Sequence, residues 1–283
     1  MNLRLGVAYM LGGSAILTLN DAVMKWLAAG HPVGQIIFVR GVFVLTLMLL
    51  LVHRPGGGGL QQLRVSTWRG PTLWGLMAVA GTYLFLSSLR FLPLADATAL
   101  TFAGPLFVVA LAPILLGESV GWGRRLGVFT GFAGVLLILK PGTSAFQWVA
   151  LLPLIVALVE GLRDILARRM ITRESSLALV FISTLLVTLS GMVSLVGGWV
   201  PMDLEQLQLL GLAACFQCSS HILMVKSFRY GQAAVISPFR YASVLWAAAI
   251  GFALWGDVID IWVAAGVALL VASGLYLLRQ DQQ

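Results

Sequence analysis

Residues 34–53 read GQIIFVRGVFVLTLMLLLVH, a run in which Arg40 is the only Lys, Arg, Asp or Glu. A bilayer core about 30 Å thick needs about 20 apolar residues per helix, so this run is long enough to cross a membrane. Only helices and closed barrels span lipid, and a run this continuous is too long for a barrel strand. Nine further runs share the pattern: 5–28, 71–91, 95–116, 122–140, 146–168, 176–198, 204–228, 233–255 and 259–279. The sequence therefore predicts an all-α polytopic membrane protein with ten transmembrane helices.

The composition excludes most soluble classes of protein. Hydrophobic residues make up 59% of the chain and charged residues 10%, against about 45–50% and about 25% in ordinary globular proteins. A soluble enzyme, a nucleic-acid binder and a disordered scaffold all need more charge. The two cysteines, Cys215 and Cys218, lie within one apolar run and fit helix packing better than a metal site. We expect no metal and no cofactor.

The basic residues predict the orientation in the membrane. If the N-terminus is inside, twelve of the 18 Lys and Arg residues lie at inner ends, two at outer ends and four within spans. Such a bias indicates N-in/C-in topology and explains the high isoelectric point without a nucleic-acid partner. The first apolar run is long enough to span, so we expect a retained helix rather than a cleaved signal peptide. The expected location is the bacterial inner membrane.

An internal repeat relates the two halves of the chain. A shift of 139 residues aligns 88–140 with 227–279, with 13 of 53 positions identical, and a shift of 143 aligns Asp21 with Asp164. This pattern predicts two five-helix repeats, residues 1–141 and 142–283. Because five is odd, the second repeat enters the membrane inverted. Inverted repeats are typical of secondary transporters, whose substrate site lies near the midplane between the repeats.

Several short motifs lie along the chain: residues 20–25, 38–41 and 116–118, Gly127 and Gly134, and Gly256–Asp257. Through these motifs the chain resembles, over essentially its whole length, the drug/metabolite transporter superfamily in its EamA branch. This resemblance implies a ten-helix transporter of small metabolites, often an exporter of amino acids. The second copy has Asp257 where the family usually has Glu. These motifs mark the fold more than the substrate.

Charged side chains within the predicted spans are candidates for gates or for coupling. Such residues are costly in lipid and by default line a cavity or form pairs. The topology predicts an outer cluster and, from the opposite repeat, an inner cluster. The outer residues are Asp21, Lys25 and Arg40, and the inner ones are Glu160, Arg163, Asp164 and Arg240. The pairs can act as alternating gates or as permanent ties between helices, and an acidic member can carry a proton.

A substrate site is predicted at matching proline-interrupted segments. Arg240 lies in Ser237–Tyr241, next to Pro238, and its aligned partner Thr101 lies four residues before Pro105. Proline removes a helical hydrogen bond and frees a carbonyl, and arginine binds a carboxylate in bidentate fashion. Arg240 is favoured over Arg40 for this role. The predicted lining also includes Tyr83, Phe102, Tyr241 and Trp246.

The leading functional hypothesis is a secondary transporter that moves amino acids outward by alternating access, with broad specificity. The main alternative is an uptake carrier for a nucleotide-like or other small metabolite. The sequence shows no hydrolase, zinc-protease or ATP-binding motif and no filter repeat, which disfavours an intramembrane enzyme, a pump driven by ATP and a channel. Facilitated diffusion and a homodimer both stay open. Gly123, Gly127 and Gly131 are spaced for close helix approach, which favours bracing roles for 122–140 and 259–279.

Overall fold

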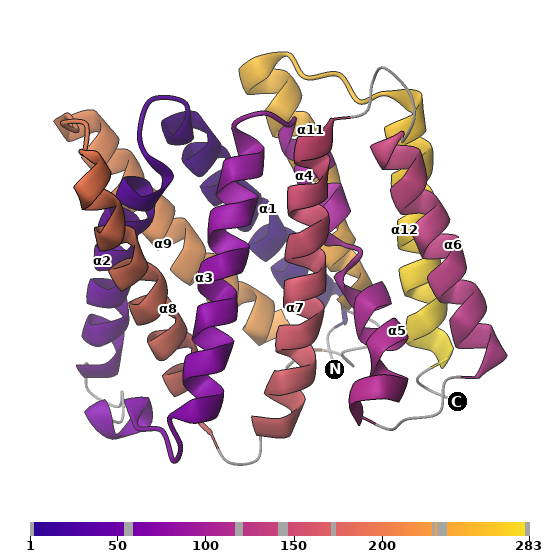
Figure 1. Cartoon of the computed structure of the whole chain (residues 1–283), viewed down its shortest axis with the longest axis horizontal. Helices are drawn as coiled ribbons and strands as arrows, with labels where there is room; N and C mark the ends of the chain where they lie inside the picture. Colours follow the sequence, from indigo (N-terminus) through magenta and orange to yellow (C-terminus); the bar gives the residue numbers. More distant parts are fainter. Residues whose placement is uncertain are drawn as a thin grey trace.

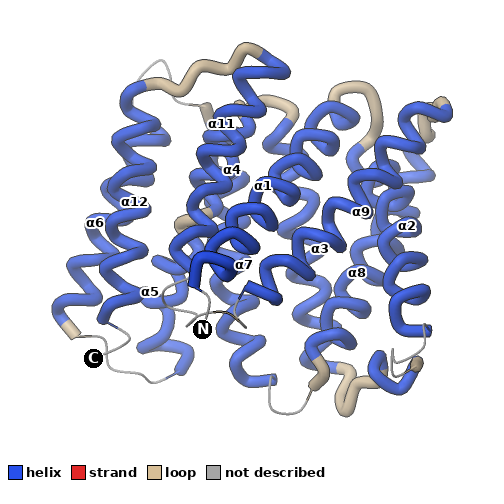
Figure 2. The backbone as a smooth tube through the Cα atoms, turned by 180° about the vertical axis from the view of Figure 1, so that it is seen from behind, coloured by secondary structure: helices blue, strands red, loops and turns tan. Residues whose placement is uncertain are grey.

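The computed structural model describes residues 3–53, 59–116, 121–140, 147–170, 174–227, 230 and 237–280. Within these ranges every regular element is a helix (Figure 2). The α-helices are α1 (Leu3–Ala28), α2 (Val33–His53), α3 (Arg69–Leu89), α4 (Leu94–Thr101), α5 (Gly104–Leu116), α6 (Trp122–Leu139), α7 (Leu151–Met170), α8 (Ser176–Val193), α9 (Leu204–Ser227), α11 (Ala242–Trp255) and α12 (Ile261–Gln280). Short 3-10 helices are η1 (Leu60–Leu63), η2 (Trp148–Ala150), η3 (Ser194–Gly197) and η4 (Ser237–Tyr241). The boundary between the predicted repeats, 141/142, lies outside the described residues.

Several helices are long and apolar enough to cross a membrane. Six stretches of the described chain qualify by length and composition: Arg4–Ala28, Val33–His53, Arg69–Leu89, Leu94–Leu111, Leu177–Gly197 and Leu204–Ser227. Three shorter apolar helices cover Arg125–Leu139, Phe239–Trp255 and Ile261–Leu277. The architecture is that of a polytopic, all-helical membrane protein.

The predicted span 95–116 consists of two helices. The chain forms α4 up to Thr101, turns at Phe102 and Ala103, and resumes as α5 at Gly104. Across the turn the amides of Phe102 and Ala103 donate to carbonyls three residues earlier. Pro105 has no amide hydrogen for the Thr101 carbonyl and its ring crowds that residue, so the α-helical bond pattern stops there.

Helices α6 and α12 pack against each other at one edge of the molecule (Figure 1). Their backbones approach so closely that a Cβ atom at Gly134 would lie 2.7 Å from the Gly266 carbonyl oxygen. Ser273 of α12 also donates a hydrogen bond of 2.6 Å to the Gly127 carbonyl. The alanines at 264, 268 and 272 instead lie on the exposed face of α12.

The first residues of α1 and the last of α12 lie at the same end of the bundle (Figure 1). The opposite end carries Ala28, Val33, Leu89 and Leu94, and the N-in/C-in prediction places it outside. We call it the outer end. At the inner end, the Glu174 carboxylate accepts hydrogen bonds of 2.8 and 2.9 Å from the amides of Ser66 and Thr67. These bonds hold the pKa of Glu174 below its ordinary value.

Candidate functional site

The break between α4 and α5 lies next to the 3-10 helix η4, which leads directly into α11. At this junction the rings of Phe102 and Tyr241 are 4.8 Å apart and tilted by 50°. These two residues occupy matching positions in the 139-residue repeat. The predicted interruptions are thus brought together, with an aromatic pair between them.

The other residues of the predicted substrate site make separate contacts. The Thr101 hydroxyl donates to the Thr98 carbonyl in its own helix, at 2.7 Å. The Tyr83 hydroxyl donates to the Ser190 carbonyl at 3.0 Å and so joins α3 to α8. The side chains of Arg240 and Trp246 are exposed. Only Phe102 and Tyr241 are in direct ring contact.

A first polar cluster joins α1 to α2. Buried Asn20 donates 2.9 Å to the Asp21 carboxylate and accepts a longer bond of 3.4 Å from Arg40. The buried Nε atom of Arg40 has no hydrogen-bond partner among the described residues. The amide therefore bridges Asp21 and Arg40, which belong to the predicted outer cluster. We call Asn20, Asp21 and Arg40 the Asn20 cluster.

A second polar cluster joins α7 to α3. Arg163 Nη1 lies 2.6 Å from Glu160 Oε1, one turn away in the same helix. The Arg163 guanidinium stacks over the Trp74 ring at 4.1 Å. Trp74 Nε1 and Arg163 Nε are buried and have no hydrogen-bond partner within the described part of the chain. Asp164, although next in sequence, has an exposed side chain. We call Trp74, Glu160 and Arg163 the Arg163 cluster.

Lys25 belongs to a third group, at the outer end. Its Nζ atom donates to the Leu92 carbonyl at 2.9 Å and lies 3.4 Å from Asp257 Oδ2. The same ammonium lies 4.7 Å from the centre of the Trp255 ring. We call Lys25, the Leu92 carbonyl, Trp255 and Asp257 the Lys25 network. It connects α1, the α3–α4 turn and the segment after α11, instead of joining Lys25 to Asp21.

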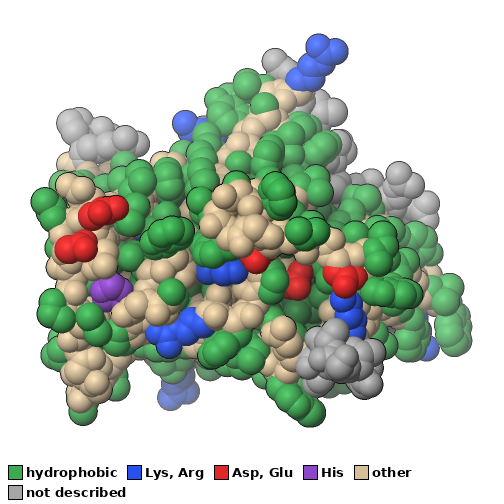
Figure 3. Space-filling view, turned by 90° about the horizontal axis from the view of Figure 1, so that it is seen from above, with side chains coloured by type: hydrophobic (Ala, Val, Ile, Leu, Met, Phe, Trp, Pro, Cys, Tyr) green, Lys and Arg blue, Asp and Glu red, His purple; other side chains and the backbone are tan. Residues whose placement is uncertain are grey.

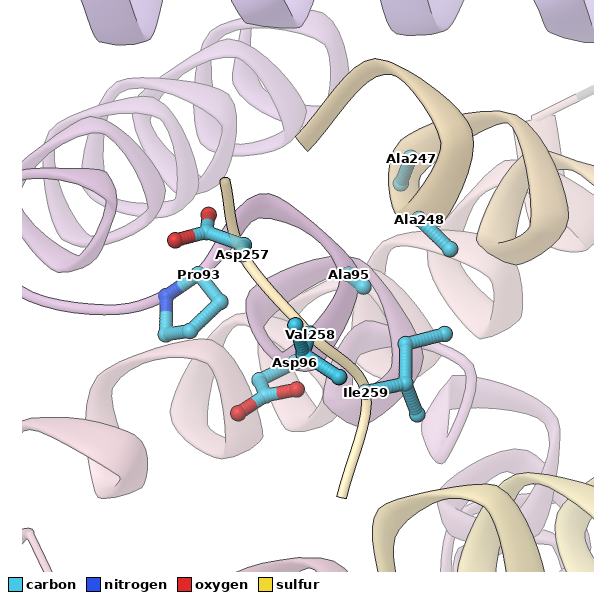
Figure 4. A pocket seen from close by; sticks show the side chains of 8 residues that line it. All are labelled: Pro93, Ala95, Asp96, Ala247, Ala248, Asp257, Val258 and Ile259. Carbon is cyan, nitrogen blue, oxygen red and sulfur yellow. The ribbon is translucent and has the colours of Figure 1, made fainter. Parts of the chain in front are cut away.

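Further charges surround the Lys25 network. Lys140 pairs with Asp260 at 2.6 Å, linking the end of α6 to the start of α12. This pair and the Trp262 amide lower the pKa of Asp260. Asp96 lines a hollow beside Asp257 (Figure 4). Seen from above, basic and acidic side chains lie next to one another near the middle of the face (Figure 3).

Sequence reasoning missed several of these residues. Leu92 contributes its backbone carbonyl, which any residue type could supply. No pattern in the sequence indicates that the Trp74 ring lies against the Arg163 guanidinium. Asp257 was recognisable, since the topology puts both Lys25 and the 257–260 acids near the outer end. Glu118, the last residue of the motif 116–118, lies outside the described residues.

Comparison with protein families gives a match along almost the entire chain. The model described as the EamA-like transporter family matches residues 4–140 and again residues 147–279. A solved crystal structure superposes with a TM-score of 0.61 and covers 98% of this chain and 99% of its own, at 16% identity. At that identity the likeness shows the fold alone.

Characterised relatives are transporters of different compounds. The S-adenosylmethionine uptake transporter of Rickettsia prowazekii is 23% identical over 98% of this chain and 94% of its own. The riboflavin transporter of Rhizobium johnstonii is 25% identical over 98% and 92%. The pseudopaline exporter CntI of Pseudomonas aeruginosa is 25% identical over 98% and 97%. These relatives include both uptake and export.

Proposed function

Because the chain belongs to the EamA-like transporter family, we propose that it is a secondary transporter, moving small metabolites across the bacterial inner membrane by alternating access. The observation that carries the proposal is the meeting of the two interrupted helices at Phe102 and Tyr241. Irregular backbone in a membrane protein is tolerated where it lines a cavity or is covered by protein. Paired interruptions in two halves mark the binding site of many carriers.

Ten spans arranged as inverted repeats, 1–141 and 142–283, underlie this mechanism. The family model matches once in each half. The helix contacts follow the same correspondence. The repeat relates α1 to α7 and α9 to α3, and α1 packs on α9 just as α7 packs on α3. It also relates α2 to α8 and α6 to α12, and the two helices of each of these pairs pack on each other. The Gly127–Ser273 contact maps onto the Gly134–Gly266 contact in the same way. These correspondences support a pseudo-twofold axis passing between Phe102 and Tyr241.

The substrate class that this site favours is an amino acid or a metabolite with an amino-acid end. Arg240 carries an exposed guanidinium in η4, suited to a carboxylate. Phe102 and Tyr241 form the junction and Thr101 precedes Phe102; Tyr83 and Trp246 stay predicted members of the lining. Arg40, with its buried and unpartnered Nε, is the second carboxylate candidate. Outward movement of amino acids is the leading direction.

Uptake of a nucleotide-like compound is the second candidate function. S-adenosylmethionine and riboflavin are the compounds that two of the relatives transport. S-adenosylmethionine combines an adenosyl group with an amino-acid end, so one site chemistry serves both candidates. The Phe102–Tyr241 rings supply the aromatic surface that a flat ring system needs.

The charged clusters act in gating or coupling in this scheme. Asp21 and Arg40 lie on the outer side of the midplane, whereas Glu160, Arg163 and Asp164 lie on the inner side. Lys25 belongs to the outer end. Ion pairs that open and close in turn would expose the site first to one side of the membrane and then to the other. Asp21 or Glu160 is the candidate proton carrier. Permanent ties between helices are the competing role.

Counterflow in proteoliposomes tests the proposal. Vesicles are loaded with unlabelled amino acids, and entry of labelled amino acid, S-adenosylmethionine or riboflavin is followed. We expect saturable amino-acid exchange that Arg240→Ala abolishes and that Arg125→Ala, a control at an exposed arginine of α6, leaves intact. Exchange of S-adenosylmethionine or riboflavin without amino acids moves the assignment to the second candidate. Absence of all exchange by folded protein contradicts both.

A further inference from the structure

The Lys25 ammonium sits among three groups that come from separate parts of the chain. The Leu92 carbonyl accepts its hydrogen bond, Asp257 supplies a carboxylate oxygen at 3.4 Å, and the Trp255 ring lies 4.7 Å away. The Lys25 side chain is only 11% exposed, although its stem is long and flexible. The ammonium group is therefore surrounded by groups from other segments, while the flexible lysine side chain that carries it can change conformation.

These three groups together form a site for a primary ammonium ion. A primary ammonium has three N–H donors and no acceptor, so a carbonyl and a carboxylate satisfy it directly. An indole face attracts the same charge, more strongly where water is excluded. A quaternary ammonium has no N–H for the Leu92 carbonyl, and a carboxylate ligand would be repelled. The chemistry selects an R–NH₃⁺ group.

A hollow beside the network gives access to Asp257. Its lining residues are Pro93, Ala95, Asp96, Ala247, Ala248, Asp257, Val258 and Ile259. It is small and partly open to solvent, with a cavity volume of about 10 Å³, which is room for about one water molecule or one ammonium group. Figure 4 shows the carboxylates of Asp96 and Asp257 at this hollow. Both acids favour the entry of a cation from the outer end.

We propose that the outer end carries a primary-ammonium site, which Lys25 fills when this end is closed and which a substrate amino group fills when Lys25 withdraws. Replacing one ammonium by another keeps Asp257 neutralised throughout. Separating the pair without a replacement leaves a partly buried carboxylate uncompensated, which is costly. The site itself stands on the geometry of the network, and only the identity of the incoming group rests on the proposed transport function.

The site is tested by rebuilding the missing ammonium with a small molecule. Lys25→Ala removes three methylene groups and the nitrogen, which propylammonium matches in size and charge. Lys25→Met keeps a stem of similar length and removes only the ammonium position, which NH₄⁺ matches. The Met variant also serves if the Ala variant does not fold. The melting temperature of purified protein in detergent is the readout, at fixed ionic strength.

We expect each matched cation to raise the Tm of its own variant by about 3 °C at tenfold excess over its Kd. Tetramethylammonium and Na⁺ should have no such effect. Adding Asp257→Asn to either variant should abolish the rise, and the wild type, whose site is filled, should not respond. A rise that persists without Asp257, or no rise in the folded Met variant, overturns the site. Because this readout involves no transport, its failure leaves the proposed function standing, and a failed counterflow assay leaves the site standing.

Discussion

The Lys25 network and the Arg163 cluster both place a cation against a carboxylate and an indole, but they differ in what they join. Lys25 and Asp257 are 232 residues apart and come from the two predicted repeats. Arg163 and Glu160 are three residues apart in α7, and only Trp74 belongs to another helix.

Because of this difference, a movement between the repeats must break the first contact but can leave the second intact. When α1 moves away from the segment after α11, the Lys25–Asp257 pair has to separate. When α7 moves as a rigid body, the Glu160–Arg163 pair moves with it, and only the Trp74 stacking changes. The network is thus the better candidate for a gate, and the cluster for a permanent feature of α7.

Charge reversal at Asp257 should give the largest effect. Asp257→Lys puts two ammonium groups beside the Leu92 carbonyl, and juxtaposed like charges cost several kcal/mol. We expect the counterflow rate to fall by about tenfold or more. The swapped double variant, Lys25→Asp with Asp257→Lys, should recover only part of the rate, because it restores opposite charges but no longer offers a carboxylate at position 257 to an incoming ammonium group. A double variant as slow as the single one would show that a separable ion pair is not what matters there.

Neutralising Glu160 should have a smaller effect. Glu160→Gln keeps the shape of the side chain and leaves Arg163 stacked on Trp74, and partly exposed pairs within one helix contribute about 0.3–0.5 kcal/mol. We expect a change of about twofold in counterflow rate, with Trp74→Phe as a control that keeps a ring face. A loss as great as that of Asp257→Lys would instead mark Glu160 as a gate or a proton carrier.

Glu174 extends the comparison to the inner end, because it also joins distant segments. Its depressed pKa means that its stabilising bonds are present above the ordinary glutamate pKa and are lost as the pH falls below it. Glu174→Ala should lower Tm at pH 7 by more than Glu205→Ala, at an exposed site on α9. The difference between Glu174→Ala and wild type should shrink as the pH falls below about 4. A difference that does not depend on pH would contradict a role for the ionised carboxylate.

The Lys140–Asp260 pair should give the smallest effect. It joins two helices, as the Lys25 network does, but the Asp260 side chain is 46% exposed and salt screens such pairs. Lys140→Ala should lower Tm slightly at low salt and not at all at about 1 M salt. Because the pKa of Asp260 is depressed, the small effect should also disappear at acidic pH. A large effect that resists salt would place this pair with the Lys25 network.

Much of the fold could be predicted from the sequence, and less of the candidate site. Apolar runs gave helix positions to within a few residues for α2, α3 and α6, because a membrane demands continuous apolar length. An interruption near Pro105 was predicted, but the exact residues at which α4 ends and α5 begins were not, because the apolar run continues across them. The pairing of Lys25 with Asp257 was also not predicted, since the spacing of apolar residues along a helix does not show which distant residue packs against it.

The sequence by itself determined the all-helical membrane architecture, the family and the positions of the costly charges, because lipid imposes its requirements on every segment separately. The tertiary structure alone decided that Asn20 stands between Asp21 and Arg40, that Arg163 stacks on Trp74, and that Lys25 reaches Leu92, Trp255 and Asp257. These contacts depend on how helices rotate and pack against each other, and that is fixed by the fit of their surfaces, which no single segment contains.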